Sequence, residues 1–199
     1  MSQANCIYLD YNATTPIDPT VLSKMIDCLK DNFGNASSKN HFFGKRSERL
    51  LSQARNQVAD LVNCSEKEIV FTSGSTESIN LAIKGIIFAN NSSTPHIITV
   101  NTEHKAVLDT CNYLENIGVR VSYLGVNEQG IVDLENLEQE VGDDTVLVVV
   151  MLANNETGVI QPLQEISQIT KKHNIPLFTD ATQAIGKIPV DIEELGVDL

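Results

Sequence analysis

The stretch TVLVVVM, residues 145–151, decides the fold because a strand formed there is apolar on both faces. Such runs are typical of parallel strands that helices cover on each side. The chain contains further runs of strand length, EIVFT (68–72), HIITV (96–100), VRVSYL (119–124) and IPLFT (175–179). Helix-like segments separate them, and this alternation predicts an α/β fold, a three-layer sandwich with a mostly parallel sheet.

The segments between the strands have the three- and four-residue apolar spacing that indicates helices. The side chains with this spacing are Ile79, Ala82, Ile83 and Ile86, then Val107, Cys111 and Leu114, and finally Ile166 and Ile169. Ahead of them, Asp18 and Pro19 predict a helix start, Gly34 can close that helix, and another helix is expected over residues 46–62.

The domain organisation expected from this pattern is an N-terminal segment, residues 1–17, followed by part of one large domain, residues 18–199. The last residues, ELGVDL, predict the start of a further buried strand.

Composition and charge exclude several classes of protein. The chain is 42% hydrophobic and 20% charged, as soluble globular proteins are. No apolar run approaches the roughly 20 residues that cross a bilayer, and the start MSQANCIYLDYN lacks the features of a signal peptide. We therefore expect a cytoplasmic protein with no membrane partner. A net charge of -12 argues against binding to nucleic acid.

The cysteines are Cys6, Cys28, Cys64 and Cys111, which lie far apart with no C-x-x-C pair. This spacing indicates neither a disulfide framework nor a zinc site. We expect no metal, and we expect most of these side chains to be buried as small hydrophobes.

The segment FTSGSTESIN, residues 71–80, passes from a predicted strand through a glycine turn into a helix. Two interpretations are open. The free backbone N–H groups of the helix start can bind a phosphate, with a hydroxyl of Thr76 or Ser75 as a further donor. Alternatively, Ser75 or Thr76 is the cap of an ordinary capping box.

Polar side chains follow three more strands of the predicted sheet. His104 follows HIITV, Asn155 lies in ANNETG (153–158) after TVLVVVM, and Asp180 and Gln183 follow IPLFT. Each has a structural alternative, because surface histidines, polar turns and carboxylates at the mouth of a sheet are common. Ligands of open α/β sheets nevertheless bind at this edge.

One ligand that explains all four strand ends is pyridoxal phosphate. Its phosphate needs a helix N-terminus, its ring needs a flat partner, and its pyridine nitrogen needs an anion to stay protonated. Asp180 can supply that anion.

These residues lie in motifs that resemble those of cysteine desulfurases of the NifS/IscS type, in the class V aminotransferase group of fold type I enzymes that depend on pyridoxal phosphate. The matching segments are YLDYNATTPIDP, FGNASSKNHFFG, EIVFTSGSTESINLAIKG, TEHKAVLDTC, NNETGVIQPL and DATQAIGKIPVDI, all in the family's order and spacing. The resemblance implies the large-domain fold of these transferases, without its C-terminal part and without the small C-terminal domain.

The resemblance also implies roles for the residues at the strand ends. Ser75 and Thr76 bind the phosphate, and His104 stacks on the cofactor ring and can transfer protons. Asp180 pairs with the pyridine nitrogen, and Gln183 hydrogen-bonds the phenolic oxygen.

The implied reaction converts L-cysteine to L-alanine and leaves a persulfide for iron-sulfur cluster assembly, with Asn155 near the substrate carboxylate or the cofactor. The Schiff-base lysine and the sulfur-accepting cysteine of the family have no counterpart up to Leu199, and Lys105 and Lys187 do not match the lysine's position. We expect the 199-residue chain to be inactive alone and to bind the cofactor non-covalently at most.

Two alternatives stay open. The substrate can differ, as in a selenocysteine lyase or another class V aminotransferase. The chain can also be a non-catalytic relative that forms a homodimer or associates with a full-length desulfurase, because a sheet cut after this point exposes an unpaired edge.

Overall fold

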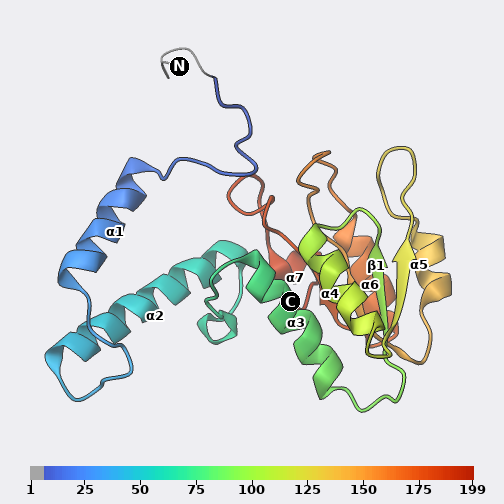
Figure 1. Cartoon of the computed structure of the whole chain (residues 1–199), viewed down its shortest axis with the longest axis horizontal. Coiled ribbons are helices and arrows are strands. Elements are labelled where there is room, and N and C mark those ends of the chain that lie inside the picture. The colour runs from blue at the N-terminus through green and yellow to red at the C-terminus, as the bar shows by residue number, and fades with distance from the viewer. Residues whose placement is uncertain (1–6) are drawn as a thin grey trace. The chain divides into compact units, whose positions relative to one another are not determined.

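In the computed structural model, which describes residues 7–199, four strands form one sheet in the order β2-β1-β3-β4 (Figure 1). The strands are β1 (His96–Val100), β2 (Arg120–Leu124), β3 (Thr145–Val149) and β4 (Leu177–Phe178). Every pairing between them is parallel, which confirms the predicted sheet.

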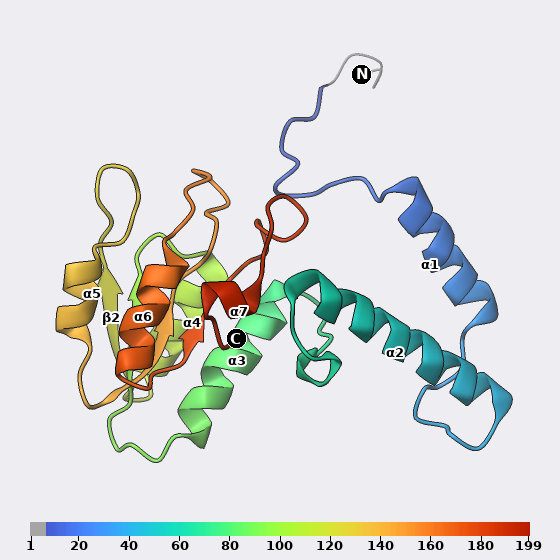
Figure 2. The same ribbon diagram turned by 180° about the vertical axis from the view of Figure 1, so that it is seen from behind.

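Helices cover both faces of this sheet, and each face has its own apolar core. Ile97 and Leu147 pack on the face covered by α3 (Ser75–Ala89) and α4 (Lys105–Glu115). The next residue of each strand, Ile98 or Val148, packs on the opposite face. That face is covered by α5 (Leu134–Glu140) and α6 (Leu163–Lys172). Figures 1 and 2 show α4 on one side of the sheet and α5 and α6 on the other, so the three-layer prediction is confirmed.

The chain divides into two compact units. Unit 1 contains the described residues up to Asp60 together with Ser65–Ile69, and unit 2 contains Leu61–Cys64 and Val70–Leu199. The expected boundary after residue 17 stays a prediction. Residues 1–6 of that segment, Cys6 among them, lie outside the described residues.

The predicted strand over residues 68–72 is wrong. Glu66–Glu68 form a short 3-10 helix, and the residues after it have no regular structure. Val70 is 67% exposed and Phe71 is 46% exposed. A strand needs a neighbour for its backbone hydrogen bonds, and no strand in residues 7–199 pairs with this segment.

The predicted strand in ELGVDL is also absent as a regular element. A short helix, α7 (Ile192–Leu195), occupies its start. The following residues nevertheless lie along β4, because the Thr179 N–H donates to the Leu199 carbonyl and the Asp198 N–H donates to the Leu177 carbonyl, both at 2.9 Å.

The helices of unit 1 begin or end at positions different from those predicted. α1 (Pro19–Asp31) starts as expected, with the Asp18 side chain accepting the Thr20 and Val21 N–H groups. It ends at Asp31, and its C-cap is Asn32 rather than Gly34. α2 (Phe42–Val62) starts four residues earlier than position 46.

Sequence analysis missed α5, a helix of unit 2, because seven residues are too few to display a helical period.

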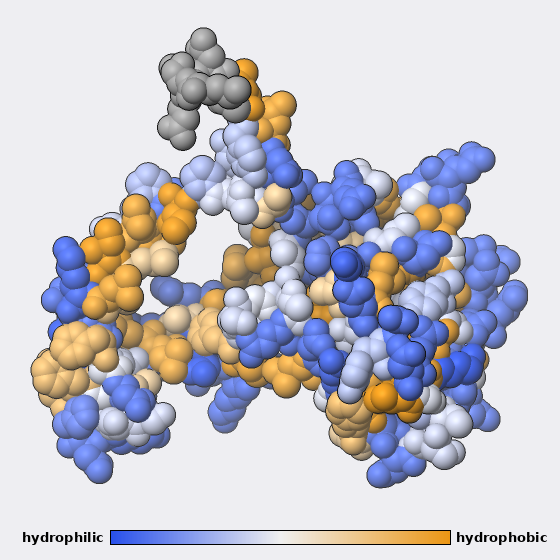
Figure 3. All heavy atoms as spheres, viewed as in Figure 1, coloured by the Kyte–Doolittle hydropathy of each residue, from blue (hydrophilic) through white to orange (hydrophobic). Residues whose placement is uncertain are grey.

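α1 has no buried residue, and its apolar side chains face the surface. Figure 3 shows them gathered over this helix. They are Val21, Leu22, Met25, Ile26 and Leu29. Contiguous exposed apolar surface of this kind is typical of a contact with another protein.

Two other sequence expectations concern cysteines and membranes. Cys111 is buried as expected, but Cys28 is exposed on α1 and Cys64 is half-buried, so burial holds for only one of the described cysteines. Of the helices within residues 7–199, none combines the length and the apolar character needed to cross a membrane.

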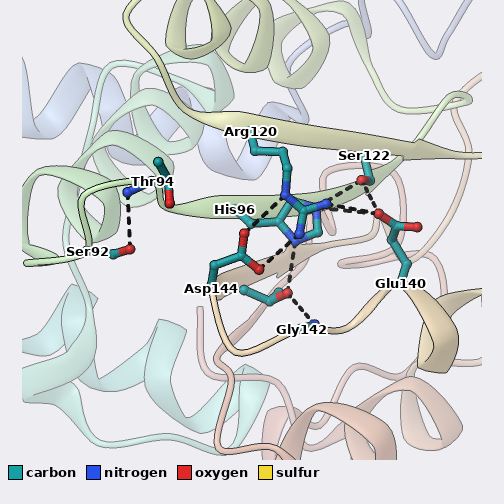
Figure 4. Close-up of polar contacts among 9 residues, drawn as sticks. Ser92, Thr94, His96, Arg120, Ser122, Glu140, Gly142 and Asp144 are labelled. Atoms are coloured by element: carbon teal, nitrogen blue, oxygen red, sulfur yellow. Dashed lines mark hydrogen bonds and ion pairs between the residues drawn. The ribbon is translucent and has the colours of Figure 1, made fainter.

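His96 is fully buried at the start of β1, at the edge where the strands begin. Its Nδ1 lies 2.9 Å from Thr145 Oγ1, and its Nε2 lies 2.9 Å from Ser122 Oγ (Figure 4). The Ser122 hydroxyl donates to Glu140 at 2.6 Å, so it must accept from His96 Nε2–H. In the neutral imidazole that has its proton on Nε2, Nδ1 is an acceptor for the Thr145 hydroxyl, whose oxygen also accepts the Gly142 N–H.

Charged side chains surround this imidazole. Arg120 makes two hydrogen bonds to Asp144 and one to Glu140. Burial lowers the pKa of His96 below its ordinary value of 6.5, and the positive charge of Arg120 acts in the same direction, while Asp144 and Glu140 oppose them. Folding therefore favours the uncharged ring.

The buried imidazole makes stability depend on pH. The pKa of His96 is lower in the folded chain than in the unfolded chain, where it is 6.5. The contribution of His96 to the free energy of unfolding is therefore complete above pH 6.5 and is lost as the pH falls below that value. We expect urea unfolding at pH 7.5 and 5.5 to show a loss of up to about 1.4 kcal/mol per pH unit from this group. His96→Gln should reduce that loss, whereas His173→Gln, at an exposed histidine, should keep it. An equal pH dependence in wild type and His96→Gln would contradict the assignment.

Candidate functional site

The candidate site lies at the edge of the sheet where the strands end. His104 follows β1, Asn155 follows β3, and Asp180 follows β4. Because these strands are parallel, the three turns meet at one edge. We call this edge the rim. Figures 1 and 2 show the loops after β2 and β3 at the top of unit 2. In both views the first turn of α3 is the upper end of that helix, which runs downward from there.

The segment after β3 connects the turns of the rim. The Asn154 side chain donates to the Thr102 carbonyl at 2.9 Å, and the Met151 N–H donates to Glu103 Oε1 at 2.7 Å. On its other side, the Leu152 N–H donates to the Asp180 carbonyl at 3.0 Å. The turns that carry His104 and Asp180 are therefore both bonded to the same few residues.

The start of α3 offers backbone donors. Gly74 is the N-cap and has no side chain, so the first N–H groups, those of Ser75 and Thr76, have no cap. Glu77 accepts both the N–H and the hydroxyl of Ser73, at 2.7 and 2.5 Å, and these bonds lower the pKa of its carboxyl. The capping box with Ser75 or Thr76 as cap is therefore wrong, because both residues lie inside the helix.

His104 is the N-cap of α4. Its Nδ1 accepts the Ala106 N–H at 3.1 Å, and the side chain is exposed. When the imidazole is neutral, this bond places the ring proton on Nε2. The residue therefore has a structural task that sequence analysis did not foresee, and Nε2 is its nitrogen for any ligand.

Asp180 is only 7% exposed, although it lies in a turn. Its Oδ1 accepts the Thr182 N–H at 2.9 Å. Gln183 follows in the same turn, and the Lys187 ammonium donates to its side-chain oxygen. Asn155 is half-buried beside Asn154, whose Oδ1 accepts the Glu156 and Thr157 N–H groups as turn chemistry predicts.

Sequence analysis missed Glu103. It is 6% exposed, and burial raises its pKa to about 8; Met151 opposes this shift through its N–H, and the charge of Asp180 adds to it. Burial, followed by the charges of Glu103 and Glu115, raises the pKa of the Cys111 thiol to about 12, so this cysteine is not a nucleophile. The signal for Glu103 in the sequence was an acidic residue in the short turn between a buried strand that ends at Val100 and the helix cap His104.

The residues of the rim fit pyridoxal phosphate chemically. A dianionic phosphate suits the uncapped start of α3. The protonated pyridine nitrogen suits a buried carboxylate such as Asp180, and the amide of Gln183 suits the phenolic oxygen. His104 provides a flat ring at the same edge.

Comparisons with known proteins show the family of the chain. The chain matches the family model Aminotransferase class-V over residues 7–199. It is 53% identical to the cysteine desulfurase IscS of Glaesserella parasuis serovar 5 (strain SH0165), over 97% of this chain and 48% of that protein.

Solved structures match equally far along the chain. A NifS-like protein superimposes with a TM-score of 0.92 at 43% identity, over 96% of this chain and 53% of that one. SspA in complex with cysteine gives a TM-score of 0.92 at 38% identity, over 96% of this chain and 55% of that one. The chain spans about half the length of the curated relatives it matches.

The capping role of His104 is testable without a ligand. His104→Ala should lower the free energy of unfolding by about 1 kcal/mol, because the first turn of α4 loses its side-chain acceptor. His104→Asn should restore most of this loss, since asparagine is a good N-cap, and urea unfolding of the three chains measures it. An unchanged stability of His104→Ala would contradict the capping role.

Proposed function

Since the chain belongs to the class V aminotransferase family, whose members depend on pyridoxal phosphate, we propose that it carries about half of a cysteine desulfurase of the IscS/NifS type. The proposed reaction takes sulfur from L-cysteine, leaves L-alanine, and holds the sulfur as a persulfide for iron-sulfur cluster assembly. The cytoplasmic location stays a prediction.

The observation that carries this proposal is the buried carboxylate of Asp180 at the rim. Its turn and the turn that bears His104 are both hydrogen-bonded to the residues after β3. A buried charge needs a partner, and a pyridinium nitrogen is the partner that the family's cofactor provides.

In the proposed site each residue acts on one part of the cofactor. The N–H groups of Ser75 and Thr76, with the Thr76 hydroxyl, bind the phosphate. Asp180 holds the proton on the pyridine nitrogen, and Gln183 donates its amide N–H to the phenolic oxygen. His104 lies against the ring and can move a proton through Nε2, the nitrogen that the α4 cap leaves available.

Substrate binding involves Asn155, whose amide can donate to the carboxylate of L-cysteine or to the cofactor. When bound, the cofactor supplies an electron sink that weakens the bonds at the substrate α-carbon. The protein's task at this rim is to keep the ring nitrogen protonated and the ring fixed.

One observation favours a second candidate function, a non-catalytic interaction protein. The apolar side chains of α1 are exposed on a helix without buried residues. In this second candidate function the chain forms a homodimer or associates with a full-length desulfurase, and the partner covers this face. Light scattering separates the cases, because a monomer that does not bind a full-length relative would exclude the interaction role. A substrate panel with cysteine and selenocysteine tests the remaining alternative of a selenocysteine lyase.

Cofactor binding by the 199-residue chain should depend on Asp180. Pyridoxamine phosphate is the suitable probe, because its amine does not react with surface lysines. Asp180→Asn should weaken its binding by about 10- to 100-fold, the range that a charged hydrogen bond supports. Asp109→Asn, at an exposed position of α4, is the matched control and should bind like wild type. Fluorescence titration measures these affinities, and equal affinity in both variants would contradict the role of Asp180.

Desulfurase activity should be absent from the 199-residue chain. Neither the Schiff-base lysine nor the sulfur-accepting cysteine of the family has a counterpart in it, and both groups form covalent bonds in the reaction. With L-cysteine and pyridoxal phosphate we expect sulfide and alanine release equal to that of the cofactor alone, while a full-length IscS gives turnover. Release above the cofactor-only level would refute the expectation.

A further inference from the structure

Glu103 bridges two elements of the rim that are far apart in the sequence. Its backbone N–H donates to the Val100 carbonyl at 3.3 Å, in the turn after β1. Its side-chain Oε1 accepts the Met151 N–H at 2.7 Å, beyond the end of β3. The residue that follows it is the α4 cap His104. The carboxyl group therefore fixes the position of the His104 turn against β3.

The second carboxyl oxygen, Oε2, is buried and has no hydrogen-bond partner among residues 7–199. An ionised carboxylate in this place would be removed from water with a single backbone donor to compensate its charge. Burying a charge without a partner is costly, and the group takes up a proton instead. The nearby start of α4 favours an anion, but this effect is smaller than the cost of burial.

The titratable groups that act on this carboxyl do not favour its charge. Asp180, from the turn after β4, raises the pKa of Glu103. A negative charge on Glu103 in turn raises the pKa of the Cys111 thiol on α4. Met151 provides the opposing contribution through its N–H. A negative charge on one carboxylate disfavours a negative charge on its neighbour. Both carboxyls accept one backbone N–H, from Met151 and Thr182 respectively. Among residues 7–199, however, Glu103 Oε2 is a buried oxygen without a hydrogen-bond partner, and no oxygen of Asp180 is.

We propose that Glu103 is a positioning residue that acts in its protonated, uncharged form. Through Oε1 it holds the His104 turn on β3, and because it carries no charge it leaves Asp180 as the anion available to a ligand at this rim. The second part rests on the proposed function, whereas the first part concerns the chain alone.

The test is the pH dependence of stability in Glu103→Gln. Glutamine keeps the acceptor oxygen and never ionises. In the wild type, the pKa of Glu103 is about 8 in the folded chain and 4.5 in the unfolded chain. The contribution of the Glu103 proton to stability is therefore complete below pH 4.5 and is lost as the pH rises toward 8. The folding equilibrium constant of Glu103→Gln relative to wild type should therefore rise between these values, by up to about tenfold per pH unit.

Glu128→Gln, at an exposed position in the loop after β2, is the matched control and should show no such rise. A ratio for Glu103→Gln that stays flat or falls with pH would overturn the proposal, because it would mean that Glu103 is charged in the folded chain. If Glu103→Gln does not fold, carbon NMR of the wild type labelled at the glutamate carboxyl carbons decides. One resonance titrating near pH 8 supports the proposal, and none overturns it.

The bridge itself is tested by amide hydrogen exchange at Met151. Glu103→Leu removes the acceptor without adding charge, so Met151 should exchange about 5- to 30-fold faster than in wild type, as loss of one buried hydrogen bond allows. Glu103→Gln should restore the protection. Equal exchange in wild type and Glu103→Leu would overturn the positioning role. None of these measurements uses the cofactor, so they separate this inference from the proposed function.

Discussion

The burial of β3 on both faces is the constraint on which unit 2 depends. Leu147 and Val149 pack under α3 and α4, while Val148 and Val150 pack under α5 and α6. Complete burial of one such side chain stabilises a fold by about 1.5–3 kcal/mol. Because β1 and β4 both pair with this strand in parallel, their ends must reach the same edge. The position of every proposed ligand-binding residue after a strand follows from that pairing.

The two edges of the sheet differ in how their polar groups are satisfied. At the edge where the strands begin, His96, Thr145 and Ser122 form a chain of hydrogen bonds that ends on Glu140. At the rim, within the described part of the chain, the start of α3 lacks a side-chain cap and Glu103 Oε2 lacks a hydrogen-bond partner. Buried polar groups are normally paired, and exceptions often accompany function. The contrast supports the rim as the ligand-binding edge. It supports a structural role for the opposite edge, where the strands begin and His96 is buried, which we call the His96 edge.

Sequence patterns predicted the elements whose stability is local or whose burial is unambiguous. Asp18 caps α1 as expected, and TVLVVVM forms the central strand between two helical layers. The prediction for residues 68–72 was wrong because an apolar run indicates burial without naming a partner strand, and residues 7–199 offer none. The role of Glu103 could not be predicted from the sequence either. Its hydrogen-bond partner Met151 is 48 positions away, and its protonation depends on burial that only the fold creates. At the rim, the sequence placed His104 and Asp180 after the correct strands but did not reveal that His104 also caps a helix.

The central claim is that the rim of this sheet binds a phosphorylated pyridine ring through residues far apart in the sequence. Backbone amide NMR of the 199-residue chain during titration with pyridoxamine phosphate tests it most directly, with inorganic phosphate as a second titrant. The account predicts that inorganic phosphate shifts the amides of Ser75 and Thr76 alone, and that the full probe also shifts those of His104 and the Asp180 turn. Shifts confined to the His96 edge, or shifts at Ser75 and Thr76 with none at Asp180, would contradict it.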